Sequence, residues 1–341
     1  MLKGANRLLA ATVLAVGSAM AGHAQPAVPP ITPVELKVSH YLPPNHTVQK
    51  VLEDWAQVVE ARSGGRLKLR IYPASQLGPV QRQFDLARNG QADMAVGLTG
   101  ATPGRYPMTE LASLPFVEPK GAVTSAAMSR RITELAPKYL APEFAGLHLL
   151  WVGVQPLNTF FTARKEIDSL TDLKGLKMRF QGEQHAKVLR ALGAVPLQVP
   201  PGEIADGMSK GVIDGAVFNY EAAESFGLAS VTQHVMEPTF LPSTLLLAMN
   251  QAKYDALPPD LRAIIDDTTG PAAAEAFGAR WDLAQQHGRD AMGAAKVGIN
   301  TLAPAEVEKL RTTLQPVVRD DVALLDKAGK PASQFMEDYT R

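Results

Sequence analysis

The stretch "DLKGLKMRFQGEQHAKVLRALGAVPLQVP", residues 172–200, contains a helix between two short strand-like segments. "LKMRF" is the first strand, Gly182 follows it, and the segment from about Glu183 is helical until "GAVPLQV" begins the next strand. A strand–helix–strand order is typical of a parallel sheet with helices on its faces. Arg179 lies near the end of the first strand. Its guanidinium is either solvated on the wet face of the sheet or aimed into a cleft at the carboxyl end of the strand, where ligands of such sheets bind.

The same alternation occurs nearer the start of the chain. The pattern predicts a strand at 35–42, a helix at 46–62 that ends at Ser63-Gly64-Gly65, and a second strand that is closed by Pro73. A further helix leads to a strand at 92–98. This βαβαβ order predicts a second, mostly parallel sheet and therefore a second α/β lobe.

The chain is predicted to cross between the two lobes more than once. It leaves the first lobe near Gln155-Pro156 and returns with a strand at 243–250. A helical segment at 258–296 contains Gly270-Pro271, which predicts a break or kink. Ligands of hinged two-lobed proteins bind between the lobes, which close over them. The predicted division is a first lobe of residues 31–154 plus about 243–282, and a second lobe of residues 155–242 plus about 283–341.

The N-terminal segment and the composition indicate in which compartment the protein works and which classes of partner are not favoured. "MLKGANR" followed by an apolar run and Gly22-His23-Ala24 is typical of a secretory signal peptide, residues 1–24, which predicts a periplasmic location. Without Lys3 and Arg7, the 34 basic and 34 acidic residues become 32 and 34, a net charge of about −2. This balance does not favour a nucleic-acid partner. The chain has no cysteine, which excludes disulfides and zinc–thiolate sites.

The usual signatures of catalysis are missing from the sequence. It contains no G-x-S-x-G elbow, no H-E-x-x-H, no Walker A loop and no G-x-G-x-x-G turn. The histidines are scattered and no pair of carboxylates suits general acid–base chemistry. We therefore expect a binding protein and no catalytic residues. A periplasmic enzyme acting on a small carboxylate is the alternative from another class.

Five segments occur in the order expected of one family: "IYPASQLGP" (71–79), "LPF" (114–116), "DLKGLKMRF" (172–180), "LGAVPLQVPPGEI" (192–204) and "KGVIDGAVFNYEA" (210–222). In these the chain resembles the solute-binding proteins of tripartite ATP-independent periplasmic (TRAP) transporters, of the DctP-like group. The resemblance implies a two-lobed α/β periplasmic-binding-protein architecture with hinge strands and a long helix across both lobes. It also implies small organic acids as ligands and a sodium-driven membrane permease as partner. The receptor of an ATP-driven transporter is the alternative within binding proteins.

The resemblance also implies a role for Arg179, because the family's "GLK-x-R" arginine clamps the ligand carboxylate. A planar guanidinium can give a carboxylate two parallel hydrogen bonds, which supports that role. The next site strand departs from the family pattern: Val217 and Phe218 stand where many relatives have glutamate and asparagine. Asn219 comes one residue later, which turns its side chain to the other face of a strand.

The other candidate ligand contacts are aromatic or polar residues near predicted strand ends. An apolar or aromatic monocarboxylate fits a cleft of this composition. A cation held by Glu221 and Gln181 that bridges to the ligand is the alternative to a metal-free site, and no other cofactor is expected. The predicted contacts beside Arg179 are Phe218, Asn219, Tyr220, Gln181, Gln155, Asn158, His40, Tyr41, Thr99 and Glu221.

Overall fold

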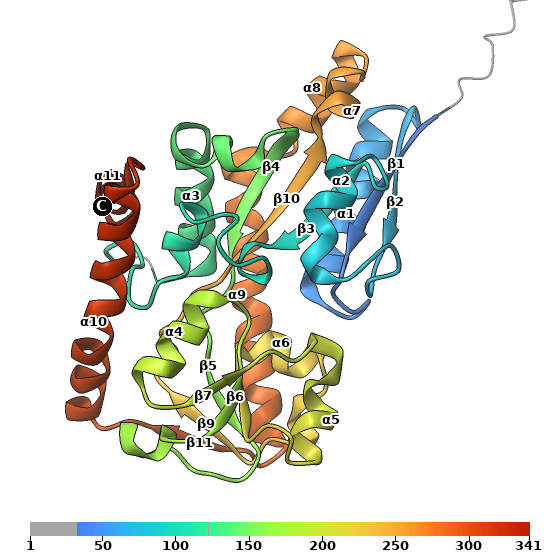
Figure 1. Ribbon diagram of the computed structural model, residues 1–341. Coiled ribbons are helices and arrows are strands. Elements are labelled where there is room, and N and C mark those ends of the chain that lie inside the picture. Colours follow the sequence, from blue (N-terminus) through green and yellow to red (C-terminus); the bar gives the residue numbers. More distant parts are fainter. Residues whose placement is uncertain (1–32, 122) are drawn as a thin grey trace, which may run out of the picture. The chain divides into compact units, whose positions relative to one another are not determined.

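The computed structural model describes residues 33–121 and 123–341, so the predicted signal peptide, residues 1–24, lies outside the described residues. Residues 33–341 form one compact unit that contains two β-sheets (Figure 1). No helix in this part of the chain is both long and apolar enough to cross a membrane.

The first sheet has the strand order β2-β1-β3-β10-β4. Strand β1 is parallel to both β2 and β3, as the βαβαβ pattern predicts, whereas β10 is antiparallel to β3 and β4. The strands are β1 (Val34–His40), β2 (Leu67–Tyr72), β3 (Met94–Leu98), β4 (Leu147–Val154) and β10 (Thr244–Asn250), and the helices beside them are α1 (Thr47–Arg62), α2 (Gln83–Arg88) and α3 (Ser125–Tyr139).

The second sheet has the order β11-β9-β5-β8-β6-β7, in which β6 is parallel to β7 and β8. Strand β6 therefore has its carboxyl end, and with it Arg179, on the same edge as the end of β8. The strands are β5 (Thr159–Thr162), β6 (Lys177–Arg179), β7 (Val195–Leu197), β8 (Gly215–Phe218), β9 (His234–Glu237) and β11 (Gly298–Thr301), with helices α4 (Glu183–Ala191), α5 (Ile204–Ser209) and α6 (Tyr220–Ser225).

Two segments connect the sheets side by side. One follows β4 and contains Gln155, as predicted, and the other precedes β10. They pair where the backbone N–H of Asn158 donates to the carbonyl oxygen of Leu241 at 2.8 Å, and the Asn158 side chain donates to the same oxygen at 2.7 Å. Paired crossing segments are the hinge expected of a two-lobed binding protein.

The long helix α9 (Gly270–Ala294) packs against both lobes: against α1, α3 and β4 of the first and α6 of the second. Glycines permit the two closest approaches. A Cβ on Gly278 would lie 2.5 Å from the backbone nitrogen of Ala126, and one on Gly288 would lie 2.4 Å from the carbonyl oxygen of Tyr220. The predicted break before this helix is confirmed, because α8 (Pro259–Asp267) ends before it; α7 (Gln251–Asp255) follows β10.

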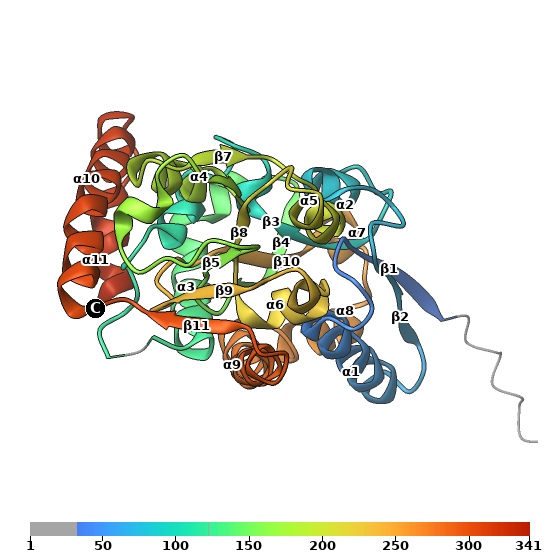
Figure 2. The same cartoon turned by 90° about the horizontal axis from the view of Figure 1, so that it is seen from below.

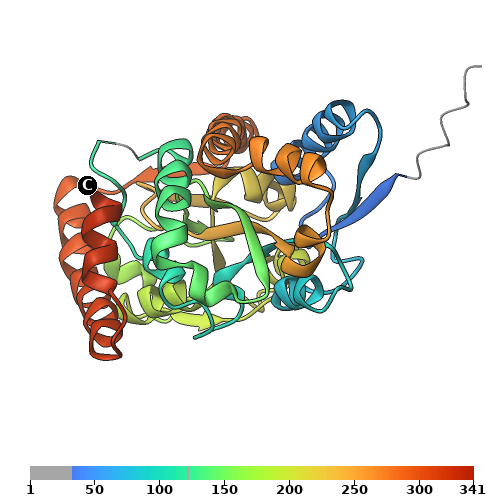
Figure 3. The same cartoon turned by 90° about the horizontal axis from the view of Figure 1, so that it is seen from above.

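The last two helices, α10 (Pro304–Lys327) and α11 (Ala332–Thr340), pack against each other (Figure 2). Helix α10 contacts α4 of the second lobe, whereas α11 contacts α3 (Figure 3). The rings of Phe335 and Tyr139 meet edge to face at 5.5 Å within the first lobe's core. The division predicted from the sequence assigned all of residues 283–341 to the second lobe, whereas α11 contacts α3 of the first lobe. Helical periodicity shows that a face is buried but not which sheet buries it.

Candidate functional site

A cavity of about 390 Å³ lies between the carboxyl ends of the strands of the two sheets. Its volume is within the range of small-molecule sites. The first lobe contributes residues that follow β1 and β3, and the second contributes residues that follow β6, β7 and β8. Its lining includes Tyr41, His46, Leu98, Gly100, Ala101, Gln155, Arg179, Gln181, Val199, Phe218 and Phe226.

Arg179 ends β6 and lines the cavity, yet its side chain is almost completely buried, with 4% of the residue exposed. Its Nε donates to the carbonyl oxygen of Val199 at 3.3 Å, and its guanidinium lies 5.1 Å from the centre of the Phe218 ring. Its Nη1 has no hydrogen-bond partner, and no carboxylate of the described residues forms an ion pair with it. Burial lowers the pKa of Arg179 to about 10, so the group stays charged at neutral pH. A buried, uncompensated cation is costly unless an anion joins it.

Two more polar side chains line the cavity with capacity to donate. Burial raises the pKa of Tyr41 above its ordinary value, which keeps its hydroxyl protonated. The Oε1 of Gln155 accepts from Asn219 at 3.2 Å, which leaves the amide nitrogen of Gln155 for another partner. Gln181 also lines the cavity, but both ends of its amide are engaged: it donates to Asn158 at 3.1 Å and accepts from Ser243 at 2.8 Å.

The remaining wall of the cavity is largely apolar. The rings of Phe218 and Phe226 meet edge to face at 5.8 Å, and Leu98 and Ala101 contribute aliphatic surface from the first lobe. Among the predicted contacts, the structure thus brings Arg179 together with Tyr41, Gln155, Gln181 and Phe218.

The other six predicted contacts do not line this cavity. Asn219 caps α6, since its Oδ1 accepts from the backbone N–H of Ala222 at 2.8 Å. Tyr220 points into the second lobe's core and its hydroxyl donates to Glu237 at 2.8 Å. Asn158 is used in the hinge. Asn219 lies beyond the end of β8, and its side chain does not line the cavity because it caps α6 and donates to Gln155.

His40 and Thr99 are likewise satisfied within the first lobe. The Nε2 of His40 lies 2.6 Å from Oε1 of Gln49, and its Nδ1 accepts from the backbone of Leu42. Burial lowers the pKa of His40 to about 4, which keeps it neutral. The Thr99 hydroxyl donates to the buried carboxyl of Glu110. Both residues lie near strand ends, as predicted, but their side chains have partners within their own lobe.

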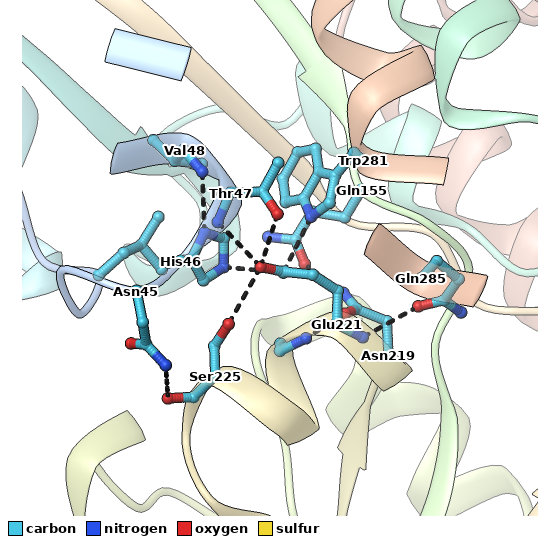
Figure 4. A network of polar contacts seen from close by, with 12 residues as sticks. Asn45, His46, Thr47, Val48, Gln155, Asn219, Glu221, Ser225, Trp281 and Gln285 are labelled. Carbon is cyan, nitrogen blue, oxygen red and sulfur yellow. Dashed lines mark hydrogen bonds and ion pairs between the residues drawn. The ribbon is translucent and has the colours of Figure 1, made fainter. Parts of the chain in front are cut away.

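Glu221 lies beside the cavity in a network of donors (Figure 4). His46, Thr47 and Trp281 are among the residues whose N–H or O–H groups reach its carboxylate. Burial raises the pKa of Glu221, but His46 and these hydrogen bonds more than offset that effect, so its pKa is lowered overall. The carboxylate therefore has partners without a cation. Within 33–121 and 123–341, no three or more acidic or histidine side chains cluster as a metal site would require.

Several lining residues were not predicted. Val199 contributes a backbone carbonyl, which no side-chain pattern reveals. Phe226 follows α6, and nothing in its local sequence distinguishes it from a core residue. His46 was predicted to begin a helix, and it does cap α1, but its position on the cavity wall depends on how the first lobe meets α6.

Comparisons with known proteins agree with this geometry. Three solved structures similar to this chain are TRAP solute-binding proteins. One from Rhodoferax ferrireducens, in complex with copurified benzoate, is 32% identical with a TM-score of 0.85 and covers 90% of this chain and 96% of its own. One from a marine metagenome, specific for aromatic acid ligands and bound to 3-hydroxybenzoate, is 29% identical with a TM-score of 0.85, covering 90% and 97%. One from Bordetella bronchiseptica, with bound (R)- and (S)-mandelate, is 27% identical with a TM-score of 0.83, covering 90% and 98%.

The family assignment rests on most of the chain. Residues 38–323 match the family described as bacterial extracellular solute-binding protein, family 7. That range includes the whole cavity wall and both sheets, apart from the first four residues of β1 (34–37). Family and structural neighbours are solute-binding proteins, in keeping with the missing catalytic signatures. The chain belongs to the DctP family of extracellular solute-binding proteins, within the TRAP group.

Proposed function

We propose that the protein captures a monocarboxylate with an apolar or aromatic body in the cavity between its lobes. One observation carries the proposal: Arg179 is a buried cation whose Nη1 has no partner, and it faces a cavity large enough for a small molecule. A ligand carboxylate would supply the missing acceptor and the missing negative charge at once.

The surroundings of Arg179 support the choice of ligand body. Phe218, Phe226, Leu98 and Ala101 offer apolar surface, which favours a ring or short aliphatic body over a polyhydroxylated one. Arg179 is the one arginine or lysine on the cavity wall among the described residues, so a second carboxylate would be left without a cation. The aromatic acids bound by the similar structures are of the same class.

The family supports the wider role. We propose that the mature protein works in the periplasm and delivers its ligand to a sodium-driven TRAP permease. A test of this part is uptake of labelled ligand by vesicles that carry the permease subunits encoded beside this gene. Uptake that needs this protein and an inward sodium gradient would support it, and uptake that needs ATP instead would refute it.

The capture itself is tested by calorimetry of refolded, ligand-stripped protein. Benzoate, 3-hydroxybenzoate and mandelate are compared with phthalate, which adds a second carboxylate, and with benzamide, which keeps the shape of benzoate without the charge. We expect binding of the monocarboxylates, with weaker binding of phthalate and none of benzamide. At a hundredfold excess over Kd, a bound acid should stabilise the fold by about 2.7 kcal/mol. Equal affinity for benzamide and benzoate would refute the role of charge.

A further inference from the structure

The carboxylate of Glu221 accepts four hydrogen bonds and has a histidine nitrogen 3.1 Å away, and these partners come from three parts of the chain. Its Oε1 accepts from the backbone N–H and the hydroxyl of Thr47, at 3.0 and 2.9 Å, and from the hydroxyl of Ser225 at 3.1 Å. Its Oε2 accepts from Nε1 of Trp281 at 3.0 Å and lies 3.1 Å from Nε2 of His46. Only 3% of the residue is exposed. Such a set of donors is far more than a surface carboxylate gathers, and it uses nearly all the acceptor capacity of the group.

The tautomer of His46 is fixed by its place at the start of α1. Its Nδ1 accepts from the backbone N–H of Val48 at 3.1 Å, so its proton is on Nε2. Burial lowers the pKa of His46, which keeps the ring neutral. The Nε2–H side of the neutral ring therefore faces the Glu221 carboxylate at 3.1 Å while Nδ1 caps the helix, and this arrangement needs no proton uptake.

The donors come from both sides of the ligand cavity. His46 and Thr47 belong to the first lobe, where they begin α1, whereas Glu221 and Ser225 belong to α6 of the second lobe. A further hydrogen bond joins the same two segments, from the side-chain amide of Asn45 to the carbonyl oxygen of Ser225 at 3.2 Å. Figure 4 shows the two segments facing each other across Glu221.

Glu221 is also held by α9, the long helix that packs against both lobes. Helix α6 begins against α9, where Oε1 of Gln285 accepts from the backbone N–H groups of Tyr220 and Glu221, at 2.8 and 3.2 Å. Trp281 approaches the carboxylate from one turn earlier on α9. The carboxylate is thus positioned by α6 and α9, and the start of α1 is the part that must arrive when the lobes meet.

We propose that Glu221 is the closure latch of this protein, whose carboxylate holds the start of α1 against α6 while the ligand is enclosed. The inference rests on the proposed capture of a carboxylate between the lobes and gives Glu221 a role other than ligand contact. When the lobes separate, Glu221 exchanges His46 and Thr47 for water. When they close, it regains two charge-assisted hydrogen bonds from Thr47 and the close contact with His46 in a buried site, where such interactions are stronger. The latch therefore acts mainly on ligand release.

The test compares two variants with a matched control. Glu221→Gln replaces one carboxylate oxygen with an NH₂ group, which would face the donors of Thr47 or Trp281. Thr47→Val removes the hydroxyl that donates to Glu221. The control is Glu224→Gln, on the same helix, because Glu224 also pairs with a histidine, His287, at 2.9 Å, but in an exposed position. The dissociation rate of benzoate should rise at least about tenfold in Glu221→Gln and roughly fivefold in Thr47→Val. It should stay within about twofold of wild type in Glu224→Gln, as expected of an exposed pair.

Lobe closure is measured in a separate experiment, so that an effect of the substitutions on the fold is not mistaken for an effect on closure. The chain has no cysteine, so Val58→Cys and Val212→Cys, at exposed positions of the two lobes, can carry spin labels for distance measurement. With saturating benzoate, we expect a single short distance in wild type and Glu224→Gln, and an added longer distance in Glu221→Gln. Thr47→Val, which leaves the charge in place, should show the same change to a smaller extent.

The outcomes separate the latch from the function on which it rests. If wild type closes on benzoate and both latch variants close and release it equally, the latch is refuted while carboxylate capture stands. If wild type neither binds nor closes on any carboxylate, the proposed function is refuted. In that case the latch is tested without ligand. It predicts a longer distance between the two spin labels in Glu221→Gln than in wild type, and equal distances would refute the latch as well.

Discussion

Replacing Arg179 with methionine should abolish most carboxylate affinity while leaving the ligand-free protein at least as stable as wild type. The two effects have opposite signs because Arg179 is a buried cation without a carboxylate partner in the described residues. A structural arginine would lose both stability and affinity on substitution.

The loss of affinity follows from the contacts that the guanidinium can make. Two parallel charged hydrogen bonds contribute about 1.5–3 kcal/mol each. Their loss corresponds to a rise in Kd of roughly 10²- to 10⁴-fold.

The change in stability of the ligand-free protein follows from the burial of the Arg179 guanidinium. A pKa lowered from 12.5 to about 10 corresponds to a cost of roughly 3 kcal/mol for the charged folded state. Methionine also removes the hydrogen bond to Val199 and the contact with the Phe218 ring, each of which contributes about 1 kcal/mol. The unfolding free energy should therefore stay the same or rise by about 1 kcal/mol.

Calorimetric titration with benzoate gives Kd, and scanning calorimetry of ligand-stripped protein gives the unfolding temperature. Arg105→Met is the matched control, because Arg105 pairs with Asp85 outside the cavity. A Kd for Arg179→Met within threefold of wild type would refute the clamp. A large fall in unfolding temperature without ligand would show instead that Arg179 stabilises the fold.

Three further predictions concern other parts of the site. Tyr41→Phe removes a hydroxyl donor beside Arg179 and should raise Kd about tenfold, measured by the same titration. Gly100→Ala would place a Cβ 2.8 Å from the Cα of Gly182 across the two lobes, so it should hinder closure and raise Kd at least about tenfold. Gly202→Ala, with nothing within 4 Å, is its control, and small-angle scattering that shows equal closure would contradict the prediction. Burial raises the pKa of Glu110 to about 7, so its contribution to stability is full below pH 4.5 and is lost as the pH rises to about 7. The stability difference between wild type and Glu110→Gln, measured by denaturation, should fall by up to roughly 3 kcal/mol over that range, and a constant difference would contradict it.

Much of the fold could be predicted because local patterns determine its elements. Short windows of sequence are enough to recognise the apolar alternation of β1, the continuous apolar run of β3, and the glycine and proline that begin α9. The placement of Arg179 at a strand end was readable in the same way, since "LKMRF" followed by glycine and a helix fixes where the strand stops. Its role as the ligand clamp remains a proposal.

The rest depended on contacts between distant parts of the chain. Glu221 resembled a ligand or cation contact in sequence, but Thr47, 174 residues away, meets its carboxylate. Phe218 lines the cavity, whereas its neighbours Asn219 and Tyr220 do not. The local sequence does not distinguish these three residues. The sequence by itself determined the alternation of strands and helices in residues 35–98 and 172–200, the family and the arginine at the strand end. Only the tertiary structure decided which polar groups already have hydrogen-bond partners, because those partners depend on how the two sheets and the long helix α9 meet. Sequence periodicity indicates that a residue is buried but not which residue it contacts.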